Sequence, residues 1–203
     1  SDLLLGAVEW GYEEDGATLL AHLEKIVQYN VQSSEKEKFD GVMLDIEPYI
    51  SDSWKENPEE YMDRYISCMK KGYKFAQKNH LRTAICIPRH YDNQGLTSGL
   101  EELIKETCDE VAVMNYSCGN EIEAIRTEAA LSEKYGKELH CILEFQEVGK
   151  HGLTENKTYR NKGIDNAKET WEKLQKEYKN INVTRDYHWS RPVREMLEEK
   201  NAD

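Results

Sequence analysis

The stretch DGVMLDIE, residues 40–47, alternates between two sets of side chains. One set is wholly apolar and comprises Val42, Leu44 and Ile46. The other begins with Met43 and ends in two carboxylates, Asp45 and Glu47. Because a strand places alternate side chains on opposite faces, the stretch predicts a strand with one apolar face and one acidic face. In parallel α/β folds, ligands bind at the carboxyl ends of the strands, where both acids are predicted to lie.

Five further runs along the chain have the length and composition of strands. They cover residues 3–9, 82–88, 110–116, 138–145 and 182–189. Helical spacing of apolar residues fills segments between them, and the clearest helix starts are Asn57-Pro58 and Asn120. Strands that alternate with helices predict βαβ units and a parallel sheet.

Two parallel architectures compete, an open doubly wound sheet and a TIM barrel. The strands of an open sheet are buried on both faces and should be apolar throughout. Here several strands carry polar or bulky residues at alternate positions near their carboxyl ends, as in 45–47, 114–116, 140–144 and 187–189. This pattern favours an α/β fold of the TIM-barrel type. The chain provides about six strand–helix units, whereas a full barrel has eight.

The composition restricts the class of protein. The 203 residues predict one TIM-barrel-like domain over 1–203, and 33% charged with 38% hydrophobic residues is typical of a soluble globular protein. A net charge of -12 argues against a nucleic-acid partner, and no apolar run approaches the ~20 residues of a membrane helix. The five cysteines lack C-x-x-C spacing. We expect no metal and no cofactor, and either a cytoplasmic location or export with a leader removed.

The acidic strand resembles a known family. DGVMLDIE is similar to the D-G-x-D-x-D-x-E strand of family 18 glycoside hydrolases, the chitinase-like TIM barrels, and departs from it at Met43, where that family carries an aspartate. The run VMNY, residues 113–116, resembles the family's M-x-Y-D strand, with Ser117 in place of the last aspartate. Trp189 lies where the family often has a tryptophan at the floor of its site.

The longer run 39–49, followed by Trp54, also resembles a poorly characterised set of bacterial TIM-barrel proteins of glycosidase type. In the chitinase-like barrel the acidic strand is the fourth and the M-x-Y strand the sixth, whereas here they are the second and fourth. The resemblance therefore implies that the chain starts at the third strand and lacks the first two. Unpaired strand edges would then favour self-association.

The resemblance implies a glycosidase acting on a neutral or N-acetylated glycan. Glu47 would be the general acid that protonates the glycosidic oxygen, and Asp45 would assist it and orient the acetamido group. Tyr116 would hold the acetamide, whose own oxygen acts as the nucleophile in this substrate-assisted mechanism.

Glu144 suggests a second scheme, in which it is the nucleophile of a retaining pair with Glu47. That clan of glycosidases carries an asparagine before the strand-four acid, where this chain has Ile46. A plainer interpretation is that the strand carboxylates bind arginines, with Arg89 and Arg185 as candidates.

Several residues are predicted to bind the substrate. Tyr49 and Trp189 would stack on sugar rings, and Arg89, Asn115 and His188 would supply polar contacts. Strand alternation allows only one of His188 and Trp189 on the site face and favours Trp189. The alternative function is a noncatalytic protein that binds carbohydrate or another partner on a degenerate barrel, because a fold does not fix a function.

Overall fold

The structure is a computed structural model that describes residues 1–7, 10 and 13–202. The chain divides into two compact units, residues 1–111 and 112–203, and each is described by itself. The boundary falls inside the fourth strand. A single domain over 1–203 stays a prediction.

The described residues form six strands, which follow one another along the chain as neighbours in one sheet. They are β1 (Asp2–Ala7), β2 (Gly41–Ile46), β3 (Arg82–Pro88), β4 (Glu110–Met114), β5 (Glu138–Glu144) and β6 (Val183–His188). The registers of β1 with β2, β2 with β3 and β5 with β6 are parallel. This confirms the predicted α/β fold of the TIM-barrel type with six strand–helix units. Residues 8 and 9, predicted to end the first strand, lie outside the described residues.

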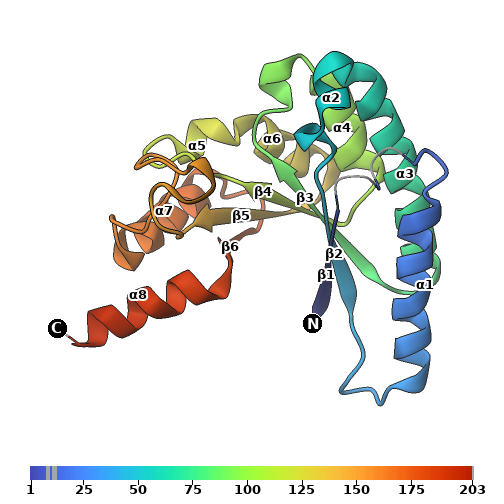
Figure 1. Cartoon of the computed structure of the whole chain (residues 1–203), viewed down its shortest axis with the longest axis horizontal. Helices are drawn as coiled ribbons and strands as arrows, with labels where there is room; N and C mark the ends of the chain where they lie inside the picture. Colours follow the sequence, from blue (N-terminus) through green and yellow to red (C-terminus); the bar gives the residue numbers. More distant parts are fainter. Residues whose placement is uncertain (8–9, 11–12, 203) are drawn as a thin grey trace. The chain divides into compact units, whose positions relative to one another are not determined.

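In the first unit, helices α1 (Ala17–Gln32) and α3 (Pro58–Lys78) lie side by side (Figure 1). They approach closely at Gly72, where an added Cβ would lie 2.5 Å from a methyl carbon of Leu19. The Asn57 side chain accepts a hydrogen bond from the Glu60 N–H, and Pro58 follows it at the first helical position. The predicted helix start is therefore the observed one.

The first unit also contains two helices that the sequence analysis did not assign. The short α2 (Asp52–Glu56) follows β2, and α4 (Thr97–Glu106) follows β3. In α4 the buried residues Leu100, Leu103 and Ile104 have helical spacing, which could have revealed it. Its N-cap position is Leu96, which provides no side-chain cap, so the usual start signal is missing.

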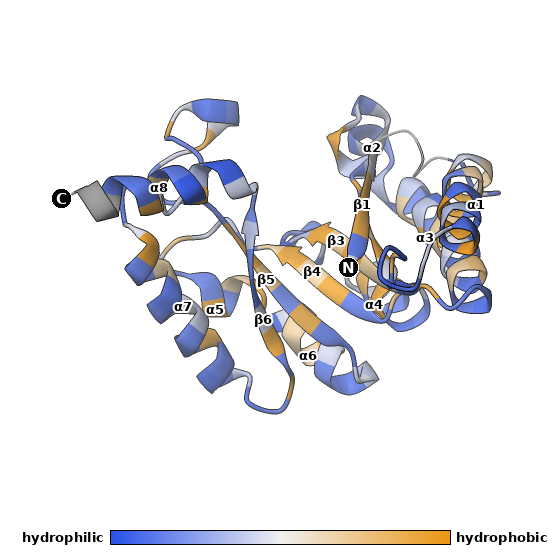
Figure 2. Cartoon of the chain, turned by 90° about the horizontal axis from the view of Figure 1, so that it is seen from below, coloured by the Kyte–Doolittle hydropathy of each residue, from blue (hydrophilic) through white to orange (hydrophobic). Residues whose placement is uncertain are grey.

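The second unit contains α5 (Glu121–Ala124), α6 (Arg126–Tyr135), α7 (Ile164–Glu177) and α8 (Ser190–Ala202). We predicted one helix from Asn120 to Gly136, and the structure interrupts it at Ile125, whose φ of -125° is not helical. β6 is hydrophobic at its start and hydrophilic along the rest, and α8 is mostly hydrophilic (Figure 2). No helix among the described residues is both long enough and apolar enough to span a bilayer.

Trp171 of α7 anchors the core of this unit. Its side chain is 4% exposed, and its indole N–H donates to the carbonyl oxygen of Cys141 at 3.0 Å. The ring also lies 6.2 Å from that of Phe145, which in turn lies 5.9 Å from that of Tyr159. The contacts fix α7 against β5.

Candidate functional site

The acidic strand β2 has the predicted alternation. Val42, Leu44 and Ile46 are at most 1% exposed, whereas Met43, Asp45 and Glu47 are half-buried. The strand ends at Ile46, so Glu47 is the first residue beyond it. Glu47 has a φ of -114° and a ψ of 65°, and the charges of both Asp45 and Glu47 act on the Tyr49 hydroxyl at the carboxyl end of β2. That the two acids share one face stays a prediction.

A glycine lies beside Asp45 in the neighbouring strand. Gly6 of β1 is the register partner of Asp45, and a Cβ at Gly6 would lie 3.3 Å from the Asp45 carbonyl oxygen. That distance is too short for most side chains to fit without a shift of the backbone. Gly6 therefore permits the close approach of β1 to β2 at Asp45.

Tyr49 fixes the orientation of Glu47. Its hydroxyl donates a hydrogen bond to Oε1 of Glu47. Burial, followed by the hydrogen bond and the charge of Glu47, raises the pKa of Tyr49 far above its usual value. Tyr49 is therefore a neutral donor at every working pH, and it holds the carboxylate in one position.

Aromatic side chains surround this pair. The Tyr49 ring contacts His90 edge-on at 5.2 Å and Tyr91 at 6.0 Å, and Trp54 lies 5.5 Å from Tyr91. Burial, followed by the neighbouring charge of Arg89, lowers the pKa of His90 and so favours its neutral ring. Trp54 and Tyr91 are buried, and Tyr91 contacts both Trp54 and the half-buried Tyr49.

Two of these residues bear on the predicted binding set. Arg89, predicted to bind substrate, is half-buried directly after β3 and forms no ion pair within the part of the chain that the structure describes. Tyr91 was not predicted as part of the site. The residues that follow Pro88 are mostly polar, as in an exposed loop. The sequence therefore did not predict that this tyrosine is fully buried beside Glu47.

Glu144 in the second unit is a buried, hydrogen-bonded carboxylate. It is 2% exposed and lies opposite His188 in the register of β5 and β6. Its Oε1 accepts from the N–H groups of Phe145 and Gln146, both at 2.8 Å. Its Oε2 lies 2.7 Å from Nδ1 of His188 and 3.2 Å from the Gln146 amide nitrogen.

These bonds determine how Glu144 titrates. Burial alone would raise its pKa, but the hydrogen bonds from His188 and Gln146 outweigh burial and lower it. Both carboxylate oxygens are thus occupied. Glu47 lies in the other unit, and the pairing of the two glutamates as acid and nucleophile stays a prediction.

The predicted binding residues of the second unit have different surroundings. The Tyr116 ring is half-buried and lies 6.0 Å from that of His188. Asn115 is 1% exposed, and its amide donates to the carbonyl oxygen of Glu121 at 2.9 Å. The Asn115 amide is therefore bonded inside the protein. The residues that cover it would have to move before it could contact a substrate.

The preference for Trp189 over His188 on the site face is corrected. β6 ends at His188, which shares the face of Glu144 and contacts it. Trp189 comes after the strand with a left-handed φ of 59°, so strand alternation does not apply to it. Its side chain is 52% exposed.

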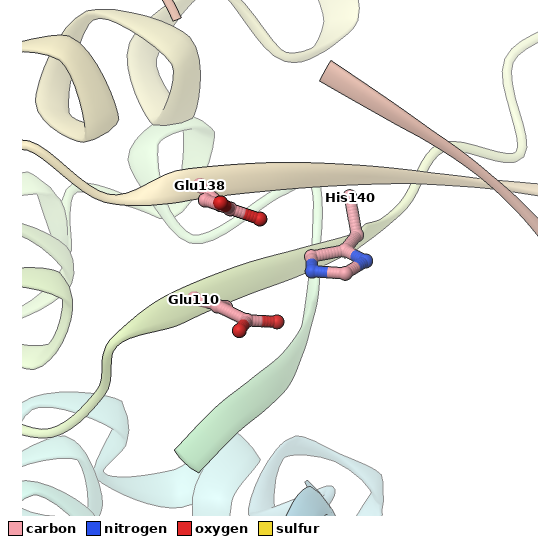
Figure 3. Close-up of side chains that lie close together, drawn as sticks. All are labelled: Glu110, Glu138 and His140. Carbon is pink, nitrogen blue, oxygen red and sulfur yellow. The ribbon is translucent and has the colours of Figure 1, made fainter. Parts of the chain in front are cut away.

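Further titratable residues lie at the other end of the strands. Glu138 and His140, the first and third residues of β5, project from the same side of the strand (Figure 3). Nδ1 of His140 lies 2.9 Å from Oδ2 of Asp186. In the first unit, Glu110 pairs with Arg82 at 2.7 Å, and Arg82 also reaches Asp2 at 3.0 Å. The absence of a metal stays a prediction.

The lowered pKa of Glu144 predicts a dependence of stability on pH. A carboxyl group with a lowered folded-state pKa stabilises the fold above the unfolded pKa of about 4.3, and this stabilisation disappears as the pH falls through the folded value. We expect Glu144→Gln to cost about 1.5–3 kcal/mol at pH 7, typical of hydrogen bonds to a charged group. The cost should shrink toward pH 3.5.

Urea unfolding at both pH values measures this difference. The exposed Glu147→Gln is the matched control and should change little at either pH. A cost of Glu144→Gln that is the same at both pH values would contradict the assignment.

Comparisons with known proteins give a distant structural likeness. No known family profile matches the sequence, and no curated protein matches it. Among solved structures, catalytic domain 2 of the Group II chitinase of Ostrinia furnacalis is similar with a TM-score of 0.38 and 13% identity. The match covers 77% of this chain and 50% of that one, so the chain spans half the length of that domain. A likeness this distant carries no inference about activity.

Proposed function

We propose that the protein is a glycoside hydrolase of a neutral or N-acetylated glycan, with Glu47 as the general acid. The observation that supports this most is that two half-buried carboxylates, Asp45 and Glu47, lie at the carboxyl end of β2 and both act electrostatically on Tyr49. Ionised carboxylates are costly to bury, and a half-buried pair at this end of a parallel strand is typical of a catalytic position.

In this proposal the neighbouring groups have defined roles. The negative charge of Asp45 disfavours the ionisation of Glu47. Glu47 therefore retains a proton that it can donate to the oxygen of the leaving group. Tyr49 orients Glu47 through its hydroxyl, and its ring, together with His90, offers an aromatic surface to a sugar. The acetamide oxygen of the substrate supplies the nucleophile, so the mechanism does not require Glu144.

A second candidate function is a noncatalytic carbohydrate-binding protein. Met43 lies on the acidic face of β2 where the resembled motif has an aspartate, and Glu144 has both oxygens occupied by hydrogen bonds. Both features would suit a surface that holds a glycan without cleaving it.

A substrate panel separates these functions. We expect the protein to hydrolyse oligomers of N-acetylglucosamine and to leave the matched glucosamine oligomers intact, because only the former carry the nucleophilic acetamide. Product release is followed by mass spectrometry. Binding of the oligomers without any hydrolysis would support the noncatalytic candidate, and hydrolysis of both series would contradict the substrate-assisted mechanism.

A further inference from the structure

The second unit contains a pocket of about 400 Å³ between the loop that follows β5 and the start of α8. Its volume lies in the roughly 300–1,000 Å³ range of small-molecule sites. Residues that supply polar or aromatic groups to its lining include Gln146, Lys150, His151, Arg160, Trp189 and Arg191. Of these, the sequence analysis identified Trp189 alone.

The backbone around this pocket is held in rarely adopted conformations. Among the described residues, the non-glycine residues with positive φ are His80, His151 and Trp189, and the last two both line the pocket. Such residues are costly for the fold and cluster at functional sites. The loop is closed by hydrogen bonds from Gly149 N–H to Leu153 O at 2.9 Å and from Leu153 N–H to Lys150 O at 2.8 Å. The loop that forms this wall is therefore held by hydrogen bonds within itself.

Three cationic side chains line the pocket in a strongly acidic chain. Lys150, Arg160 and Arg191 face two carboxylates, Glu147 and Glu195, although the chain carries a net charge of -12. Within the part of the chain that the structure describes, the Lys150 ammonium has no carboxylate partner. An ammonium group at a pocket wall that is not neutralised by an ion pair, beside two guanidinium groups, points to a negatively charged ligand.

The two arginines are oriented by their own ion pairs. Arg191 pairs with Glu195 at 2.9 Å, and Arg160 pairs with Glu199 at 2.6 Å while its other terminal nitrogen lies 3.5 Å from the carbonyl oxygen of Pro192. A guanidinium has five N–H donors, so one such pair leaves donors for a ligand. Guanidinium and ammonium groups bind carboxylates with the strongest hydrogen bonds in proteins.

We propose that this pocket binds a pyranose sugar that carries a carboxylate group. The half-exposed indole of Trp189 would stack on the sugar ring, and Lys150 and Arg191 would bind the carboxylate. The Gln146 amide links the pocket to Glu144, because its nitrogen lies 3.2 Å from Oε2 of that residue. The inference goes beyond the proposed function and does not depend on Glu47.

Two glycosides that differ at one carbon test this proposal. Methyl β-D-glucuronide carries the carboxylate, and methyl β-D-glucoside has a hydroxymethyl group in its place. Calorimetric titration of the full chain at low salt should give an affinity for the glucuronide at least about tenfold higher, as expected for charge-assisted hydrogen bonds. Trp189→Ala should lower that affinity by about tenfold or more, which is the scale of one aromatic stacking contact.

Lysine variants provide matched controls. Lys150→Gln should weaken glucuronide binding and reduce its salt dependence, whereas Lys157→Gln, an exposed lysine outside the pocket, should leave both unchanged. Glu47→Gln should bind glucuronide as the wild type does, so a failure of the proposed hydrolysis would leave this result intact. Equal affinity for the two glycosides would overturn the proposal, as would unchanged binding in a Trp189→Ala variant with a native circular-dichroism spectrum.

Discussion

Glu47→Gln should lower the turnover of an N-acetylglucosamine oligomer by about 10²–10⁴-fold, the usual contribution of a positioned general acid. The substitution preserves the shape of the side chain and its ability to accept from Tyr49. It removes only the proton that the leaving oxygen needs. The affinity for the oligomer, measured by calorimetry, should therefore stay close to that of the wild type.

The leaving group provides an internal control for this result. An aryl glycoside with a strongly activated leaving group departs without protonation, so its glycosidic cleavage should be much less sensitive to Glu47→Gln. Glu24→Gln, on the exposed side of α1, is the matched surface control and should behave as the wild type. If turnover and affinity fell together, Glu47 would be a binding residue, and the general-acid role would be wrong.

Trp171→Ala should have the largest effect on stability, a loss of about 3–5 kcal/mol, because it removes a large buried ring and leaves a cavity. The substitution also removes the donor to the Cys141 carbonyl oxygen and the contact with Phe145. Such a loss is a large part of the roughly 5–15 kcal/mol by which a typical domain is stable.

Trp189→Ala is the control for this prediction, because it removes the same side chain from a position that is 52% exposed. A surface substitution of this kind usually changes stability by about 0.5 kcal/mol or less. Urea unfolding followed by far-ultraviolet circular dichroism avoids the loss of a tryptophan signal. Amide exchange in β5 and α7 locates the effect. Equal losses in the two variants would show that Trp171 does not anchor this core.

The positions of the strands could be predicted because their apolar runs are short and bounded. β3 has the predicted bounds, and β2 ends one residue early, before the turn at Glu47 and Pro48. β4 ends at Met114, two residues before the expected end, and the amide of the next residue, Asn115, donates to the carbonyl oxygen of Glu121. The exact end of a strand depends on contacts with residues that are distant in the sequence, and a local sequence pattern does not include these contacts.

The helices show which local sequence signals were sufficient to predict where a helix starts or ends. Asn57 and Pro58 identified the start of α3, whereas α4 lacks a capping side chain and was not assigned. The break at Ile125 between α5 and α6 has no glycine or proline to announce it.

The candidate site was predictable only where it lies on one strand. Alternation along β2 identified Asp45 and Glu47 as candidates at its carboxyl end, whereas Tyr49 was predicted to stack on a sugar and its hydrogen bond to Glu47 was not predicted. The contact of Glu144 with His188 depends on the register of two strands separated by 38 residues, and Tyr91 reaches its position through the loop after β3. Neither the contact of Glu144 with His188 nor the position of Tyr91 could be predicted from the sequence.

The pocket of the second unit depends on a similar combination of distant segments. Its charged residues come from the loop after β5, from Arg160 and from α8. No spacing in the sequence joins them, and the exposed Trp189 was predicted to lie on a strand face that it does not occupy.

The position of a bound substrate relative to residue 47 tests the account most directly. A crystal structure of the Glu47→Gln variant with an N-acetylglucosamine oligomer measures the distance from the side-chain amide at position 47 to the glycosidic oxygen. The account predicts a hydrogen-bond distance of about 2.6–3.2 Å, as a general acid requires. An oligomer bound elsewhere, with the side chain at position 47 contacting Tyr49 and no glycosidic oxygen, would contradict it.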